Sequence, residues 1–160
     1  MVLSASELGE FFATFRASAF RLEQHGNYSE EDEADYFASW RRRDPMPADW
    51  RTNPWVAGIV ADGRALTRVR VLDTPRTEYE RFQLEWAYVG NARSGEDIRL
   101  LERVDAQSLP NYDFWLFDDT TAVRLIYAAN GSFIGAEPTI DTAPYRAYRE
   151  TALARAIPYQ

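Results

Sequence analysis

Apolar residues recur along this chain with two periods, and the change between them marks the expected elements. Spacings of three and four residues, together with capping side chains or prolines, predict helices that begin near Ser4, Ser29, Asn53, Thr74 and Thr142. Shorter apolar or alternating runs predict strands over residues 18–23, 68–72, 98–101, 114–117, 123–127 and 133–136.

The order of these elements predicts an α/β fold. Strands 68–72 and 98–101 are joined through a helix, which fits a right-handed crossover and places the two strands parallel in one sheet. From Asp113 onward the pattern is a meander, with Asn130 and Gly131 as a hairpin signal. We therefore expect a single layered domain over residues 1–160. Its mixed β-sheet combines a parallel crossover unit with a C-terminal antiparallel meander, and helices flank it.

Length and charge narrow the function classes. A chain of 160 residues can bury one substantial core. Its formal net charge of -7 repels phosphate backbones, so we expect no direct nucleic-acid partner. The chain has no cysteine, which excludes thiolate chemistry and sulfur-ligated metals. No apolar stretch is long enough to cross a bilayer and no signal peptide is apparent, so we expect a cytoplasmic protein without a membrane partner.

Carboxylates gather at the ends of two expected strands. Glu96 and Asp97 precede strand 98–101, whereas Asp118 and Asp119 follow the aromatic strand 114–117. Antiparallel neighbours would bring the two pairs together, as a site for a hard cation or as an acid and base pair. The alternative is acids in tight turns or paired with arginines, and we favour it because turns commonly use aspartate.

Other polar and aromatic residues are candidates for binding. Arg21 and Glu23 share one face of strand 18–23, and Arg81 and Glu85 share one face of a helix. Arginine suits bidentate recognition of carboxylate or phosphate, but we favour ordinary ion pairing with neighbouring acids as the explanation. The tryptophans, Trp86 and Trp115 among them, could line an apolar pocket with Tyr79 and Tyr88, or could form core.

No catalytic, metal or cofactor motif is present. His25 is the single histidine, and its turn context favours an exposed residue. The chain has no nucleophile elbow, Walker loop or dinucleotide fingerprint, so we assign no catalytic residue, no metal ligand and no cofactor.

Four segments carry a resemblance that spans nearly the whole chain. They are Phe15 to Glu23, Arg81 to Trp86, Gly95 to Arg99 and Asp113 to Asp119. Together they resemble an actinobacterial family of unknown function whose genes commonly lie beside those of helix-turn-helix regulators. The carboxyl-terminal half is also distantly similar to one half of a phospholipase-D-type domain. In that alignment Asn111 and Asp113 stand where the motif has its histidine and lysine, so the resemblance implies a shared fold without the activity.

The leading hypothesis is a non-catalytic regulatory domain that binds a protein partner, such as a helix-turn-helix regulator, or a small effector. The alternative is a small metal-assisted or acid-base enzyme that uses the carboxylate cluster. The expected binding residues are Arg21, Glu23, Arg81, Glu85, Trp86, Glu96, Asp97, Trp115, Asp118 and Asp119.

Overall fold

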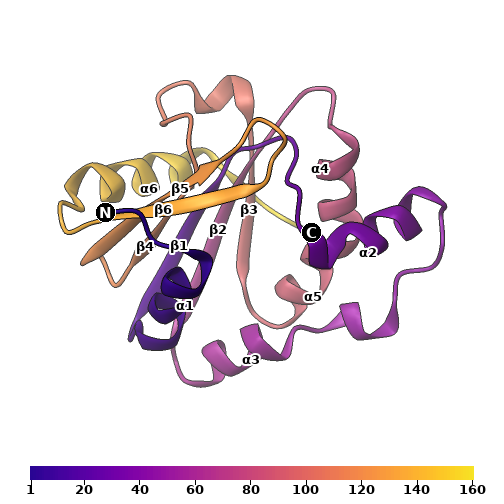
Figure 1. Ribbon diagram of the computed structural model, residues 1–160, viewed down its shortest axis with the longest axis horizontal. Helices are drawn as coiled ribbons and strands as arrows, with labels where there is room; N and C mark the ends of the chain where they lie inside the picture. Colours follow the sequence, from indigo (N-terminus) through magenta and orange to yellow (C-terminus); the bar gives the residue numbers. More distant parts are fainter.

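A mixed β-sheet forms the centre of the protein, and helices cover both of its faces (Figure 1). The computed structural model describes residues 1–160. Seven strands lie in the order β6-β5-β4-β1-β2-β3-β7. Their bounds are β1 Ser18–Glu23, β2 Ala65–Leu72, β3 Asp97–Glu102, β4 Phe114–Phe117, β5 Thr121–Tyr127, β6 Phe133–Thr139 and β7 Ile157–Pro158.

Strand polarity confirms the predicted fold class. Strand β2 pairs in parallel with β1 and with β3, and the helical segment between β2 and β3 makes the expected crossover. Strands β4, β5 and β6 form the antiparallel meander. Gly131 takes a positive φ of 86° in the turn after Asn130, a conformation that glycine adopts without a steric cost. Strand β1 pairs antiparallel with β4 and so joins the two parts of the sheet.

The helices follow the expected order. They are α1 Ala5–Thr14, α2 Glu31–Arg41, α3 Pro54–Ala61, α4 Glu78–Phe82, α5 Tyr88–Arg93 and α6 Ala143–Arg155, with a π-helical turn η2 Gln83–Ala87 and 3-10 turns η1 Ala48–Arg51 and η3 Arg103–Ala106.

The helix starts follow the sequence at some positions and not at others. A capping box at Ser4 starts α1, and the Asn53 side chain accepts the first amides of α3. Two expected starts are wrong. Thr77 caps α4 in place of Thr74, and α2 begins after Glu30 without a side-chain cap. Ser29 was the residue expected to cap α2. Its backbone amide donates instead to the carbonyl of Gly131 at 3.0 Å.

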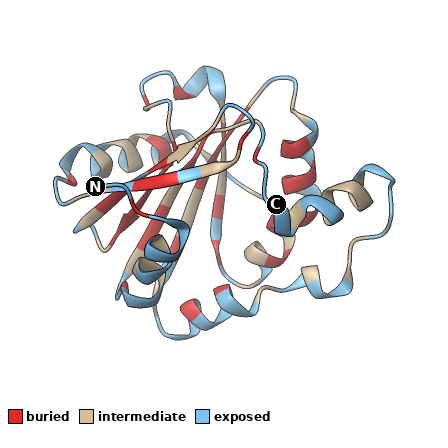
Figure 2. Ribbon diagram, viewed as in Figure 1, coloured by how far each residue is buried: buried red, intermediate tan, exposed pale blue.

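Two apolar layers enclose the sheet, one on each face (Figure 2). Helices α1 and α3 pack on one face, where Phe15 and Ile59 contact strand residues such as Leu66. Helix α6 covers the opposite face through Ala152 and partly buried tyrosines. A third cluster lies between α2 and the segment from α4 to η2 and is almost entirely aromatic, with Tyr79, Phe82 and Trp86 at its centre.

Candidate functional site

Charged side chains meet on one face of the sheet, over the second half of β1 and the middle of β2. Strand residues alternate between faces, so Arg21 and Glu23 lie on the same face as Ala19, which belongs to the apolar layer under α1 and α3. The parallel register places Arg21 beside Arg68 and Glu23 beside Arg70. The cluster therefore lies on the face of the sheet and within the strands, since Arg68 is the fourth of the eight residues of β2 and its partner Glu96 precedes β3.

Glu23 is the centre of the charged cluster. Its side chain is 3% exposed, and its carboxylate lies 3.2 Å from Arg68 Nη1, 3.4 Å from Arg21 Nη2 and 3.5 Å from Arg70 Nε. The hydroxyl of Tyr88 also donates to Glu23. A carboxylate can be buried in this way because three guanidinium groups compensate the loss of water.

The same contacts fix the protonation states in the cluster. Burial alone would raise the pKa of Glu23, but Arg68, Arg21 and Arg70 outweigh it and lower that pKa to about 2. Burial, together with the charge of Glu23, raises the pKa of the Tyr88 hydroxyl well above its ordinary value. The carboxylate is therefore ionised and the phenol is neutral across the physiological pH range.

Asp113 is a second buried carboxylate, and Arg21 connects it to Glu23. Asp113 is fully buried and accepts from Tyr28 Oη at 2.5 Å, from the Gln24 amide at 2.8 Å and from Arg21 Nη2 at 3.1 Å. Arg21 thus bridges the end of β1 to the residue that precedes β4. These hydrogen bonds hold the floor of the site in one arrangement.

The other two arginines also have buried partners. Arg68 Nη2 lies 3.1 Å from Glu96, at the start of β3. Arg70 is fully buried, donates to Gln83 Oε1 at 2.9 Å and to the carbonyl of His25 at 2.6 Å, and lies 3.8 Å from Glu80. The network therefore joins β1, β2 and β3 to the helix above them.

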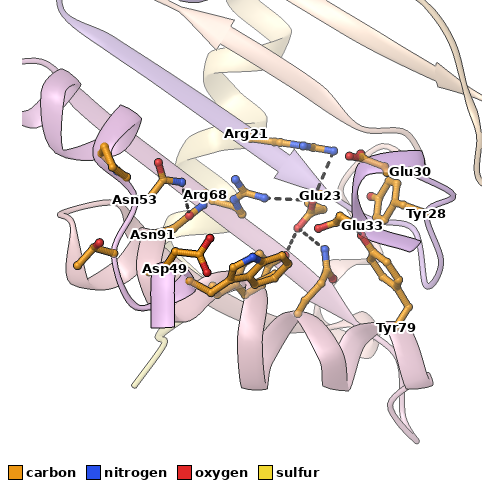
Figure 3. Close-up of a pocket in the computed structure, with 17 residues that line it drawn as sticks. Arg21, Glu23, Tyr28, Glu30, Glu33, Asp49, Asn53, Arg68, Tyr79 and Asn91 are labelled. Carbon is orange, nitrogen blue, oxygen red and sulfur yellow. Dashed lines mark hydrogen bonds and ion pairs between the residues drawn. The ribbon is translucent and has the colours of Figure 1, made fainter. Parts of the chain in front are cut away.

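A cavity of about 400 Å³ opens above this network (Figure 3). Arg21, Glu23 and Arg68 form its floor. Its walls come from the segment that leads into α2, from η1 and the start of α3, and from the α4 to α5 helix. Only 5 of its 17 lining residues are hydrophobic, so the cavity is suited to a polar molecule.

Gly90 allows two segments of the cavity wall to pack tightly against each other. A Cβ atom at this position would lie 2.5 Å from the carbonyl oxygen of Trp50 and 3.0 Å from Thr52. Only glycine lets the chain around η1 pack this closely against α5. Asn53 adds a polar link at the same junction, since its Nδ2 donates to Asn91 Oδ1 at 2.7 Å.

The mouth of the cavity carries further carboxylates. Glu30, Glu33 and Asp49 line it, and none of them forms an ion pair with an arginine or histidine. Glu33 accepts a hydrogen bond from the Tyr79 hydroxyl. Burial raises the pKa of Glu33, and the Tyr79 hydrogen bond offsets only part of that effect.

Comparison with known proteins places the chain in a family. Residues 6–160 match the model of the domain of unknown function DUF6879. The chain belongs to this family. A search of curated proteins gives no match. None of the helices in this DUF6879 domain combines the length and apolar character needed to span a membrane, and no three histidine or acidic side chains are grouped as a metal site would require.

The structure brings together some of the residues expected from the DUF6879 sequence. Arg21 and Glu23 share a face, as predicted, and both line the cavity. Glu96 lies beneath it and pairs with Arg68. Sequence reasoning missed Arg68 and the pairing of Asp113 with Arg21, although the alternating arginines of β2 were a usable signal.

The two acid pairs do not share a cleft. Strands β3 and β4 are antiparallel in direction, but β1 and β2 lie between them. Asp97 pairs with Arg99 at 3.1 Å, and Asp119 pairs with Arg149. Asp118 accepts from the amides of Arg16, Ala17 and Ser18 at 2.7 to 3.0 Å. Asp97 and Asp119, like Glu96, pair with arginines as the favoured alternative expected, whereas Asp118 accepts from amides at the start of β1 and not from the backbone of its own turn.

The remaining expected residues lie away from the cavity. Glu85 accepts from Trp40 Nε1 at 2.6 Å and lines, with Arg81 and Trp86, a separate hollow of about 320 Å³. Trp115 belongs to the apolar layer under α1 and stacks edge-on with Phe12.

The aromatic and histidine expectations are met in part. Trp50, Tyr79 and Tyr88 do line a cavity, but that cavity is polar and not apolar. The His25 side chain is 37% exposed, and its Nε2 lies 3.8 Å from the Asp113 carboxylate. It is therefore only partly exposed, whereas its turn context predicted an exposed residue.

Proposed function

We propose that this protein is a non-catalytic domain that binds a small effector in the cavity above Arg21, Glu23 and Arg68. The observation that carries the proposal is a polar cavity on one face of the sheet, over a floor of buried charged side chains that pair with one another. Its volume of about 400 Å³ falls in the range of about 300–1,000 Å³ typical of small-molecule sites.

The rigidity of the floor supports a binding role. Arg21 and Arg68 are each fixed by two carboxylates, and Glu23 is fixed by several donors. A ligand would therefore meet side chains that are already ordered, which lowers the entropy cost of binding.

The protonation states favour binding over acid-base chemistry. An efficient general base has a pKa near the working pH, whereas the pKa of Glu23 is about 2. The pKa values of the Tyr28 and Tyr88 hydroxyls are raised well above their ordinary value, in the direction opposite to that of an activated nucleophile.

We further propose that a protein partner binds this domain and that its binding depends on the effector. The family resemblance, with genes beside those of helix-turn-helix regulators, implies a regulator of that kind. The face that carries Arg81 and Glu85 is the proposed contact surface, because its hollow lies on the outer side of the same helical segment that walls the cavity.

A thermal-shift screen tests the effector proposal. The panel would contain amines, amino acids, sugars, nucleosides and carboxylates, with the melting temperature of the full chain as the readout. We expect at least one class to raise the melting temperature, since a ligand selective for the folded state stabilises it.

Two variants make the screen specific to the cavity. Ala87→Phe fills the cavity from its helical wall, and Ala57→Phe adds the same ring on the exposed face of α3. The stabilisation should be lost in Ala87→Phe and kept in Ala57→Phe. An absence of stabilisation by every class, or its survival in Ala87→Phe, would overturn the proposal.

A further inference from the structure

Two buried donors in the floor of the cavity have no hydrogen-bond partner. They are Nε of Arg21 and Nε of Arg68, and no other buried side-chain nitrogen or oxygen atom of the protein lacks one. The two arginines are paired in the register of β1 and β2, both line the cavity, and in Figure 3 they approach Glu23 from the same side. Buried polar groups of native proteins are nearly always hydrogen-bonded, so two exceptions at one place point to a ligand there.

Arg70, the third arginine of the network, is the internal control. Its Nε donates to Gln83 at 2.9 Å, its Nη1 to the carbonyl of Val71 at 3.0 Å and its Nη2 to the carbonyl of His25 at 2.6 Å. Arg70 is fully buried and does not line the cavity. Within the network, unpaired nitrogen atoms therefore occur only on the two arginines that line the cavity.

Arg21 has the largest number of free donors. All of its hydrogen bonds and ion pairs run through Nη2, to Asp113, Tyr127 and Glu23. The Nε–H group and the two N–H groups of Nη1 have no acceptor, and these are three of the five donors of a guanidinium. Nη1 is unbonded and is not among the buried unpaired atoms, so an acceptor in the cavity can reach it.

The charges around these donors are nevertheless matched. In the network Arg21, Arg68 and Arg70 face four carboxylates, those of Glu23, Glu80, Glu96 and Asp113. The mouth adds three acids that have no arginine partner, namely Glu30, Glu33 and Asp49. An anion would enter a region in which acids outnumber arginines and would be repelled. The floor therefore lacks a hydrogen-bond acceptor and not a negative charge.

A cation does not supply that acceptor. An ammonium group has donors only, so it would leave the N–H groups of Arg21 and Arg68 unpaired and lie beside two guanidinium groups. An uncharged carbonyl or hydroxyl oxygen accepts from an arginine without adding charge. A hydroxyl group can at the same time donate to a carboxylate of the mouth.

We infer that the ligand of the cavity is an uncharged polar molecule whose carbonyl or hydroxyl oxygen accepts from Nη1 of Arg21. This inference rests on the proposed function and names the ligand class. An oxygen at Nη1 also brings a negative partial charge next to the unpaired Nε–H of the same guanidinium. Uncharged sugars and amides carry such oxygens, and their remaining polar groups would hydrogen-bond to Asn53 and Asn91, which line the same cavity.

Isothermal titration calorimetry with matched probes tests the ligand class. Glucose is compared with glucuronate and with glucosamine, which have the same ring and a negative or a positive charge. Nicotinamide is compared with nicotinate, which has a carboxylate in place of the amide. We expect the uncharged member of at least one set to bind at least roughly tenfold more tightly than its charged counterparts, the size of effect that one hydrogen bond to a charged group supplies.

A conservative variant locates the contact. Arg21→Lys keeps a positive charge opposite Glu23 and Asp113 but removes the guanidinium donors. Arg64→Lys is the control, because Arg64 pairs with Asp62, has a side chain that is 18% exposed against 13% for Arg21, and does not line the cavity. We expect the affinity for the uncharged probe to fall roughly tenfold or more in Arg21→Lys and less than about twofold in Arg64→Lys.

NMR spectroscopy of the wild-type protein gives a readout that needs no variant to fold. The Nε–H resonances of Arg21 and Arg70 are followed in nitrogen-15-labelled protein while the uncharged probe is added. We expect the resonance of Arg21 to move up to saturation and that of Arg70, which is paired with Gln83 and lies outside the cavity, to stay in place. A purely structural role of Arg21 would not produce this difference.

The possible results separate the two proposals. Binding of a charged probe as tight as that of its uncharged counterpart, equal losses in the two variants, or an Arg21 resonance that does not move at saturation would overturn the ligand class and leave a binding cavity. If none of these probes binds, the compounds that stabilise the fold in the wider screen take their place, and a charged compound among them that needs the cavity overturns the class as well. If no probe binds and no compound in the screen stabilises the fold, the proposed function itself is wrong.

Discussion

The two faces of the central sheet are buried in different ways, although the same strands build both. On the face under α6, β1 and β2 contribute Phe20, Leu22, Val69 and Val71, all apolar and at most 3% exposed. On the opposite face the same strands carry Arg21, Glu23, Arg68 and Arg70. Arg70 is as fully buried as Leu22. Burial in this protein is therefore not confined to apolar side chains.

The two faces depend on different interactions. The α6 face is stabilised by removal of apolar surface from water, which is non-directional and tolerates small rearrangements. The charged face is stabilised only if each buried charge keeps its partner, because an unpaired buried charge is costly. That face therefore fixes positions, whereas the α6 face mainly supplies stability.

Removing the central charge should cause the largest loss. Glu23→Gln keeps the size of the side chain but leaves Arg21, Arg68 and Arg70 with one buried carboxylate fewer. We expect the free energy of unfolding, measured by urea denaturation, to fall by about 3–5 kcal/mol. A loss below about 1 kcal/mol would mean that the network is not held by charge.

Acidification should reduce the difference between wild type and Glu23→Gln. The pKa of Glu23 is about 2 in the folded protein, below the value of about 4.3 for an unfolded glutamate. A lowered pKa stabilises the fold above the unfolded value, and the contribution is lost as the pH falls through the folded one. Urea denaturation from pH 6 to pH 2 should therefore show a constant gap above about pH 5 that narrows below about pH 4. A gap independent of pH would contradict the charge assignment.

Truncation on the apolar face should cost somewhat less and show no such pH dependence. Leu22 is fully buried, and Leu22→Ala should lower the free energy of unfolding by about 2–4 kcal/mol through lost apolar burial and a cavity. Val104→Ala, at a position that is 71% exposed, is the control and should change it by less than about 0.5 kcal/mol. If the Leu22→Ala effect varied with pH as that of Glu23→Gln does, the contrast between the faces would fail.

Replacing Asp118, in the turn after β4, should cause an intermediate loss in the free energy of unfolding. The Asp118 carboxylate accepts three backbone amides, and these hydrogen bonds outweigh its partial burial and lower its pKa. We expect Asp118→Ala to lower the free energy of unfolding by about 1–3 kcal/mol, because three backbone amides, of which that of Ser18 is partly buried, lose their acceptor. Asp118→Asn keeps an acceptor and tolerates the positive φ of 54°, so thermal melting should show a smaller loss.

Replacing Asp97, an exposed acid of the other pair, should change the stability least. Asp97 pairs with Arg99, and both side chains are exposed by more than 30%. Asp97→Asn should change the melting temperature by no more than its exposed ion pair implies, equivalent to less than about 0.5 kcal/mol. A large loss would show that Asp97 has a role beyond this contact.

Local patterns in the sequence were sufficient for the fold class and for most of the elements, although they did not reveal β7. The period of the apolar residues located the helices and strands, and the capping box at Ser4 and the Asn53 cap located two helix starts. Thr74 was misjudged because the sequence of Thr77 and Glu80 offered a better capping box three residues later. Local hydrogen bonds between Thr77 and Glu80 decide that boundary, and both residues are visible in the sequence.

The sequence predicted only part of the candidate site. Alternation placed Arg21 and Glu23 on one face, but alternating charged residues are typical of a strand with one face in water. The structure covers that face with η1, α2 and the α4 to α5 helix, which turns a solvated edge into the floor of a cavity. Such cover depends on segments distant in sequence, so the pattern of one strand could not reveal it.

The face on which each strand residue lies follows from the sequence alone, because the side-chain period of a strand is fixed by its backbone. Which strands are neighbours depends instead on how the whole chain packs. The insertion of β1 and β2 between β3 and β4 separates the acid pairs at Asp97 and Asp118, and it brings Glu23 among three arginines. Strand order follows from packing over the whole chain, since hydrogen bonds between strands are alike whichever strands pair, and no local run of residues specifies it.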